Sequence, residues 1–74
     1  MILVTAFDRN KQDIVSVGQY EPKYAAETAL DLAQPGRYIR IMDGAWEVMF
    51  PASFPVSKAR LAHIIEHRAE VEFA

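Results

Sequence analysis

The stretch that decides the fold is residues 37–50, which read RYIRIMDGAWEVMF. Two runs of six residues, both rich in β-branched, aromatic and other apolar side chains, lie on either side of Asp43 and Gly44. Such runs are typical of strands, and an Asp-Gly dipeptide between them is typical of a two-residue type I′ turn. The stretch therefore predicts a β-hairpin.

This turn also predicts which residues face each other across the hairpin. It pairs Ile41 with Trp46, Ile39 with Val48 and Arg37 with Phe50 on one face, and Met42 with Ala45, Arg40 with Glu47 and Tyr38 with Met49 on the other. Because side chains alternate between the two faces of a strand, one face is apolar and Trp46 is expected in the core. The other face carries a cross-strand pair of opposite charge, Arg40 with Glu47.

Upstream of this hairpin the sequence predicts a second one. Residues 2–7 are apolar on both alternating sets, which indicates a strand with neighbours on both sides. A polar turn follows at residues 8–13, and residues 14–20 read as a strand that pairs back on the first. Gly18 within that strand is expected to weaken it or to mark a bulge.

Two further segments are expected to be helical. The first begins at Pro22, since the first helical position needs no amide donor, and continues to about Ala33. Its apolar side consists mostly of alanine, which lets a helix lie close to a sheet. The second helix follows Ser57, a good N-cap, with Val56 and Leu61 in the positions of a hydrophobic staple.

Together these elements predict an α+β fold with the element order ββαββα. We expect one four-stranded antiparallel sheet with both helices packed on the same face. A chain of 74 residues, 51% hydrophobic and 24% charged, has the composition of a single compact domain spanning residues 1–74.

Charge and cysteine content exclude several classes of function. Eight Lys and Arg against ten Asp and Glu give a net charge of −2, which argues against a generally basic nucleic-acid binder. Without cysteine there is no disulfide framework, no thiolate nucleophile and no Cys-ligated zinc. The apolar residues 1–4 are too few for a signal peptide or a membrane span, so the expected location is the cytoplasm.

One motif with catalytic associations stands at residues 63–67, His-Ile-Ile-Glu-His, which matches the H-x-x-E-H pattern of inverted zinc proteases. Only seven residues follow His67, so the distant third ligand of those enzymes has no counterpart. We interpret His63 and His67 as solvated helix surface. The alternatives are an adventitious or partner-bridging metal held with Glu70, and catalytic zinc.

Other enzymatic signatures are missing. The sequence contains no G-x-S-x-G elbow, no P-loop and no dinucleotide-binding glycine motif. A fold of this size is also expected to have little room for a pocket of ~300 Å³ or more. We therefore expect no catalytic residue, no cofactor and no enzymatic activity.

The expected working surface is the outer face of the sheet. It carries the partner-binding candidates Tyr38, Arg40, Met42, Glu47 and Met49. Tyr, Met and Arg are enriched at protein interfaces, and Met adapts to irregular partners. The alternative for this face is an ordinary solvated sheet.

A second candidate surface is the polar turn that contains Arg9 and Lys11. Basic residues interleaved with aromatic ones also leave open the binding of single-stranded nucleic acid. A protein partner remains the main expectation, and a homodimer is possible.

In architecture, a short, cysteine-free, mildly acidic ββαββα chain resembles small phage and mobile-element proteins, anti-CRISPR inhibitors among them. The resemblance covers the whole chain but includes no diagnostic motif, so it assigns no functional residue. It implies a non-enzymatic regulator or inhibitor that occludes a host complex, such as a defence or nucleic-acid-processing complex, in the host cytoplasm. A nucleic-acid-associated accessory protein and a structural subunit of a homo-oligomer are the alternatives.

A fainter similarity, to HicB-type antitoxin domains, is carried by residues 46–51, WEVMFP. The chain departs from that pattern directly afterwards. Residues 54–57, FPVS, stand where an acidic helix start is expected. The antitoxin similarity therefore assigns no function.

Overall fold

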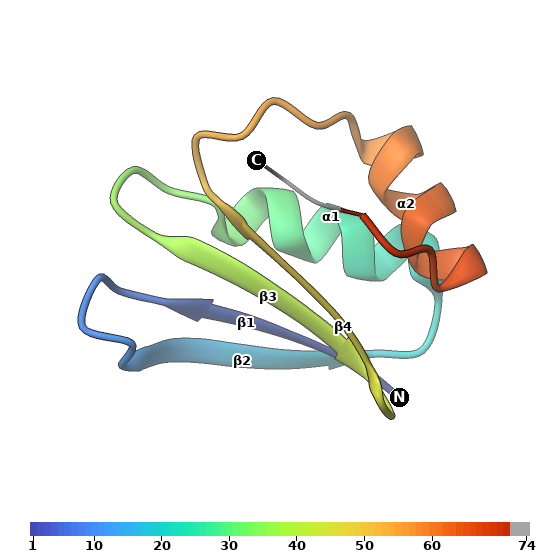
Figure 1. The fold of residues 1–74 in the computed structure, drawn as a ribbon, viewed down its shortest axis with the longest axis horizontal. Coiled ribbons are helices and arrows are strands. Elements are labelled where there is room, and N and C mark those ends of the chain that lie inside the picture. The colour runs from blue at the N-terminus through green and yellow to red at the C-terminus, as the bar shows by residue number, and fades with distance from the viewer. Residues whose placement is uncertain (72–74) are drawn as a thin grey trace.

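The computed structural model describes residues 1–71. Its elements are β1 (Ile2–Phe7), β2 (Asp13–Gln19), α1 (Pro22–Leu32), β3 (Tyr38–Asp43), β4 (Trp46–Pro51) and α2 (Lys58–His67). The strands form one antiparallel sheet in the order β2-β1-β3-β4, and both helices lie on the same side of it (Figure 1). The predicted α+β fold with ββαββα order is confirmed. None of the helices within residues 1–71 combines the length and apolar character needed to cross a membrane.

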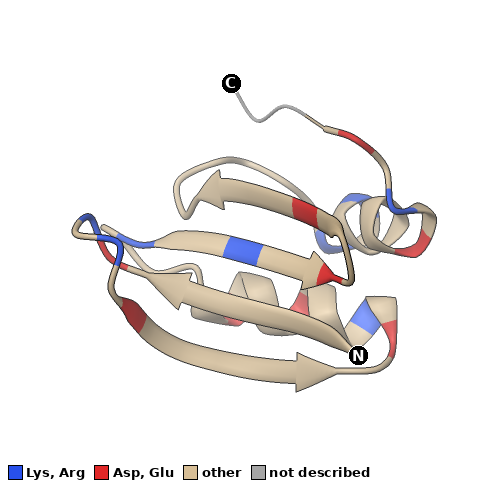
Figure 2. Ribbon diagram, turned by 60° about the horizontal axis from the view of Figure 1, so that its bottom comes forward, with Lys and Arg blue, Asp and Glu red and all other residues tan. Residues whose placement is uncertain are grey.

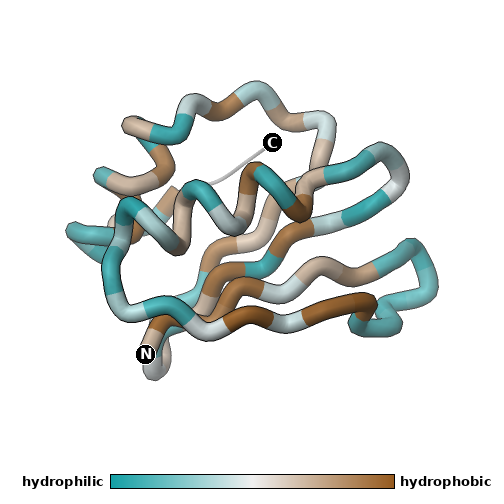
Figure 3. Tube along the Cα trace, turned by 180° about the vertical axis from the view of Figure 1, so that it is seen from behind, coloured by the Kyte–Doolittle hydropathy of each residue, from teal (hydrophilic) through white to brown (hydrophobic). Residues whose placement is uncertain are grey.

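The core lies between the sheet and the two helices, and α2 contributes Leu61 and Ile65 to it. Alternate residues of β1, β3 and β4 point toward the helices and are almost completely buried: Ile2, Val4, Ala6, Ile39, Ile41, Val48 and Phe50. On α1 the buried residues are Ala25, Ala26 and Ala29. Because alanine side chains are short, the helix backbone lies close to the strands, and the hydrophobic segments of the strands pass beneath it (Figure 3).

The β3–β4 hairpin forms, but its predicted register is wrong. The turn residues are Gly44 and Ala45, and Asp43 is the last paired residue of β3, opposite Trp46. Of the two turn residues only Gly44 has a positive φ, of 61°. This is the pattern of a type II′ turn, which requires glycine at its first central position, whereas type I′ requires a positive φ at both.

The change of turn shifts the pairing by two residues. Ile41 lies opposite Val48 where Trp46 was expected, and Arg40 lies opposite Met49 where Glu47 was expected. The assignment of faces survives, because side chains alternate with a period of two along a strand. Trp46 is partly buried and packs against the core, on the expected side.

The β1–β2 hairpin also differs in detail from the expectation. Strand β2 begins one residue earlier than predicted and ends at Gln19. Gly18 pairs regularly with Leu3, while the bulge lies near the other end of the strand, where Ile14 is inserted between the residues that pair with Ala6 and Phe7. The predicted neighbours on both sides of β1 are confirmed, since β1 lies between β2 and β3.

Helix α2 begins and ends with local capping interactions. Its N-cap is Ser57, as predicted, and the hydroxyl accepts a hydrogen bond of 3.1 Å from the Arg60 amide. At the other end Arg68 adopts a left-handed conformation with φ 48°. The Ala69 amide then donates to the Ile64 carbonyl at 3.1 Å, as in a Schellman motif.

The turn after α2 is fixed to the β3–β4 hairpin. Arg68 forms an ion pair with Asp43, and its guanidinium carbon lies 5.9 Å from the centre of the Trp46 ring. The Trp46 indole donates a hydrogen bond of 2.9 Å to the Ala69 carbonyl. These contacts explain how a non-glycine residue is held in the left-handed conformation that usually selects glycine.

Candidate functional site

The face of the sheet opposite the helices is covered by no helix or strand of residues 1–71 (Figure 2). Three rows of outward-facing residues cross its four strands. The rows, from β2 to β4, are Gly18–Leu3–Met42–Glu47, Ser16–Thr5–Arg40–Met49 and Asp13–Phe7–Tyr38–Pro51. We call this surface the open face. The structure thus brings Tyr38, Arg40, Met42, Glu47 and Met49 together on one surface.

Arg40 occupies the middle of the open face. Its Nη2 lies 3.7 Å from a carboxylate oxygen of Asp13, and its guanidinium carbon lies 5.6 Å from the centre of the Phe7 ring. The predicted ion pair with Glu47 is wrong, because the shifted register places Glu47 opposite Met42. Arg40 extends instead across β1 toward the start of β2.

The contacts of Arg40 leave part of its guanidinium unsatisfied. Its Nε is buried and has no hydrogen-bond partner within residues 1–71. The distance of 3.7 Å to Asp13 is longer than a charge-assisted hydrogen bond, which spans about 2.7–2.9 Å. The side chain remains 29% exposed and is therefore accessible from outside.

Phe7 and Tyr38 lie side by side on the two central strands. Their rings are stacked with centroids 5.6 Å apart and an angle of 18° between their planes. Phe7 is only 7% exposed, since Tyr38 and Arg40 lie against it, whereas Tyr38 is 38% exposed. Phe7 was not predicted as a member of this face. The available signal was that residues 2–7 are apolar at both alternating sets of positions, so that one set, which includes Phe7, faces away from the helices.

Beside this pair, the face has a partly buried polar contact. The Thr5 hydroxyl is hydrogen-bonded to the Ser16 hydroxyl at 2.9 Å, and Thr5 is 1% exposed. The centre of the open face is therefore itself well packed, by long side chains from neighbouring strands.

Large apolar side chains surround this packed centre. Met49 is 46% exposed and Met1 is 68% exposed. The Met1 side chain lies across Gly18, since a Cβ atom on that glycine would stand 2.5 Å from the Met1 sulfur. Met1 and Gly18 were not foreseen as part of this surface, because the pairing of β2 with β1 decides where they lie.

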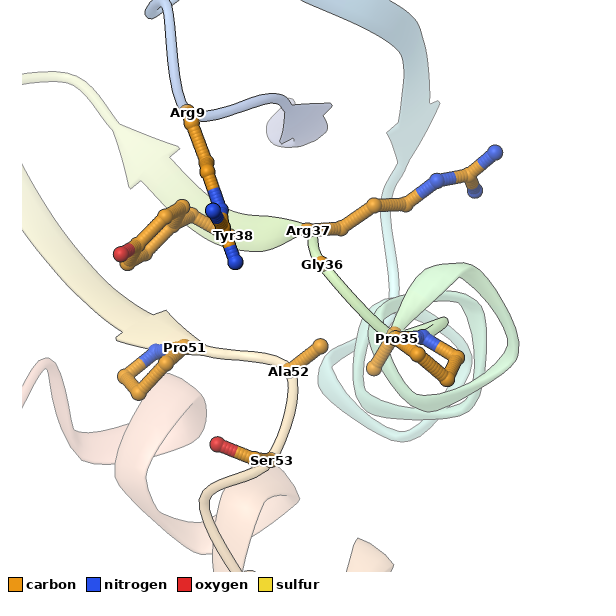
Figure 4. A pocket seen from close by; sticks show the side chains of 9 residues that line it. Arg9, Pro35, Gly36, Arg37, Tyr38, Pro51, Ala52 and Ser53 are labelled. Carbon is orange, nitrogen blue, oxygen red and sulfur yellow. The ribbon is translucent and has the colours of Figure 1, made fainter.

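The β1–β2 loop places the two predicted basic residues differently. One carboxylate oxygen of Asp8 accepts hydrogen bonds from the backbone amides of Asn10 and Gln12, at 2.9 and 3.1 Å. These two bonds fix the conformation of the loop. Arg9 extends toward Tyr38, at the end of the open face (Figure 4). Lys11, which has φ 61°, is in the same loop but does not line the adjoining pocket.

That pocket lies where the β1–β2 loop, the α1–β3 connection and the end of β4 meet. It has a volume of about 380 Å³ and is lined by Arg9, Ala33, Pro35, Gly36, Arg37, Tyr38, Pro51, Ala52 and Ser53. The expectation that so short a chain has little room for a pocket of this size is wrong, because three connecting segments border a solvent-open depression that no single element could form.

The two histidines of the H-x-x-E-H motif are exposed on α2. Their rings lie one turn apart with centroids 4.3 Å from each other. Within residues 1–71 no three histidine or acidic side chains are grouped closely enough to hold a metal ion. The motif therefore places two imidazoles and Glu66 on an exposed helix surface, away from the pocket.

The open face and the pocket share Tyr38 and Pro51, so they form one continuous candidate site at the start of β3. No protein-family model matches the chain, and comparison with curated proteins and with solved structures likewise gives no match.

Proposed function

We propose that the protein is a small non-enzymatic binding protein that occludes a protein partner with the open face of its sheet. The observation that carries the proposal is the exposure of Tyr38 and Met49 on a face that no other element in residues 1–71 covers (Figure 2). An uncovered apolar surface on a small domain marks an interaction site. Tyr, Met and Arg are also the residues enriched at protein interfaces.

Arg40 supports a partner that brings a carboxylate or a backbone carbonyl to the middle of the face. Its side chain is partly exposed, and its Nη2 is 3.7 Å from Asp13. An acceptor from the partner would form the charge-assisted hydrogen bonds that Asp13 is too distant to make. Met42 and Met49 flank this position and adapt to the surrounding apolar surface of the partner.

The same face argues against single-stranded nucleic acid as the partner. Base stacking needs exposed ring faces, but Phe7 is only 7% exposed beneath Tyr38 and Arg40, and the 38% exposed Tyr38 already has one ring face stacked on Phe7. The charge of Arg40 is offset by Asp13, and Glu47 makes no ion pair within residues 1–71. An anionic backbone would therefore meet little net positive charge here.

The proposal includes the mode of action that the resemblance to small phage proteins implies. A domain of 74 residues acts most simply by covering the working surface of a larger partner. A host defence or nucleic-acid-processing complex in the cytoplasm is the kind of partner that fits such a regulator or inhibitor. Self-association through the open face is an alternative that the following experiment separates.

The test compares two double variants with matched charge changes. Arg40→Glu with Met49→Asp alters the open face, whereas Arg60→Glu with Ala59→Asp alters the exposed side of α2. Partners captured from host lysate are identified by mass spectrometry, and the affinity of each variant is then measured with the purified partner. We expect the open-face variant to bind at least about 100-fold more weakly, which corresponds to roughly 3 kcal/mol, and the α2 variant to bind like the wild type.

Three results would contradict the proposal. The first is a partner that the open-face variant retains, and the second is equal loss of binding in both variants. The third is salt-sensitive binding of single-stranded DNA or RNA at low salt. Sedimentation velocity of the wild type separates a foreign partner from a second copy, since a monomer at micromolar concentration excludes the self-association alternative.

A further inference from the structure

The pocket next to Tyr38 has apolar walls and no acidic lining residue, in a chain whose net charge is −2. Pro35 and Pro51 form rigid parts of the wall, with the Tyr38 ring between the pocket and the open face. Its volume of about 380 Å³ is within the range of about 300–1,000 Å³ that small-molecule sites occupy. The walls thus suit a flat or apolar molecule.

Arg9 supplies the charge in this pocket. In Figure 4 its side chain extends from the β1–β2 loop toward the space beside Tyr38. The loop is fixed in place by the two amide hydrogen bonds to Asp8. Within residues 1–71 the Arg9 guanidinium has no ion pair, and none of the described hydrogen bonds involves it. An unpaired guanidinium on an ordered loop is suited to bind a carboxylate or phosphate through two parallel hydrogen bonds.

The other polar groups of the lining have unequal roles. Ser53 lines the pocket, but in Figure 4 its hydroxyl lies on the other side of the Pro51–Ala52 backbone from Arg9. Arg37 points away from the pocket, and its Nη1 donates to the Leu32 carbonyl at 3.3 Å, at the end of α1. The charge available to a ligand therefore comes from Arg9.

From this arrangement we infer that the pocket binds a small organic anion, in which a phosphate or carboxylate group is attached to a flat or apolar body. The oxyanion pairs with the Arg9 guanidinium, and the body packs between Tyr38 and the two prolines. The inference does not depend on the proposed partner of the open face. Because Tyr38 belongs to both surfaces, a ligand in the pocket would adjoin a protein bound to the open face.

The test titrates the isotope-labelled protein with phenyl phosphate, benzoate and inorganic phosphate, following the backbone amides by NMR. We expect saturable shifts at residues 36–38 and 52–53 with phenyl phosphate, with benzoate or with both. Comparing the titrations with phenyl phosphate and with benzoate shows whether the pocket prefers a phosphate or a carboxylate. Inorganic phosphate is expected to bind at least about 10-fold more weakly, since it has no apolar body to pack against the walls.

Variants within a single loop provide the control. Arg9→Ala is expected to weaken binding at least about 10-fold, whereas Lys11→Ala, which removes the same charge outside the pocket, changes it less than about twofold. Circular dichroism and urea unfolding confirm that both variants fold. The inference is overturned if neither organic anion gives saturable shifts, if inorganic phosphate binds as tightly, or if both variants weaken binding equally.

Discussion

The two faces of the sheet are built from the same four strands but differ in what covers them. On the helix side Val4, Ile39 and Ile41 have no exposed surface, because an alanine-faced helix lies directly on them. On the open side the centre is packed by side chains of the sheet itself, and Tyr38 and Met49 remain substantially exposed. The helix-covered face therefore holds most of the buried apolar core, while the other face keeps part of its apolar surface exposed.

The largest difference in the free energy of unfolding between substitutions on the two faces is expected on β4, where neighbouring residues point to opposite faces of the sheet. Phe50 is 2% exposed and Met49 is 46% exposed. Phe50→Ala is expected to lower the free energy of unfolding by about 3–5 kcal/mol, since it removes buried area and leaves a cavity. Met49→Ala should cost less than about 0.5 kcal/mol, and urea denaturation measures both. Similar losses for the two variants would mean that the faces contribute equally.

The next effect concerns the close approach of α1 to the sheet. Ala26 is completely buried, so Ala26→Leu introduces a side chain for which no space exists. We expect this substitution to destabilise the fold by about 1–3 kcal/mol. Ala59→Leu adds the same atoms on the exposed side of α2 and should be nearly neutral. Thermal unfolding of the pair measures the difference, and a neutral Ala26→Leu would show that the alanine face leaves free space.

A smaller effect is expected at the buried centre of the open face. Thr5 is 1% exposed and shares its hydroxyl hydrogen bond with Ser16. Thr5→Val keeps the shape but loses this bond, which is expected to cost about 1 kcal/mol. A double-mutant cycle with Ser16→Ala isolates the coupling between the two hydroxyls. A coupling energy of zero would mean that the hydrogen bond contributes nothing to the packing of this face.

The smallest effect is expected for the ion pair between Arg40 and Asp13. Its atoms are 3.7 Å apart, and the two side chains are 29% and 58% exposed. Asp13→Asn should therefore change the free energy of unfolding by less than about 0.5 kcal/mol. Unfolding at low and at high salt checks this value. A loss above about 1 kcal/mol would indicate that Arg40 is held rigidly by Asp13 and is not available to a partner.

Much of the fold could be predicted because it depends on short-range patterns. Alternating apolar residues identified the hairpin at residues 37–50, and Ser57 identified the start of α2. The exact turn could not be read in the same way. The dipeptide Asp43-Gly44 is compatible with a turn in which glycine is the first central residue and with one in which it is the second. The ion pair between Asp43 and Arg68 joins residues 25 positions apart in the chain, which local patterns do not reveal.

The candidate site was predictable only in part, for the same reason. The side of the sheet on which Tyr38, Arg40, Met42, Glu47 and Met49 lie follows from the period of two along a strand. Their partners do not follow from it. Arg40 meets Phe7 and Asp13 because β1 lies between β2 and β3, which is a property of the whole sheet.

The sequence by itself determined the order of the elements, the face of each strand that is apolar and the cap of the last helix, since these depend on neighbours a few residues away. Only the tertiary structure decided the register of the β3–β4 hairpin, the packed centre of the open face and the pocket. Each of these brings together residues distant in the chain, such as Arg9, Tyr38 and Ser53. Their proximity depends on the packing of the strands and connections as a whole, which local propensity does not specify.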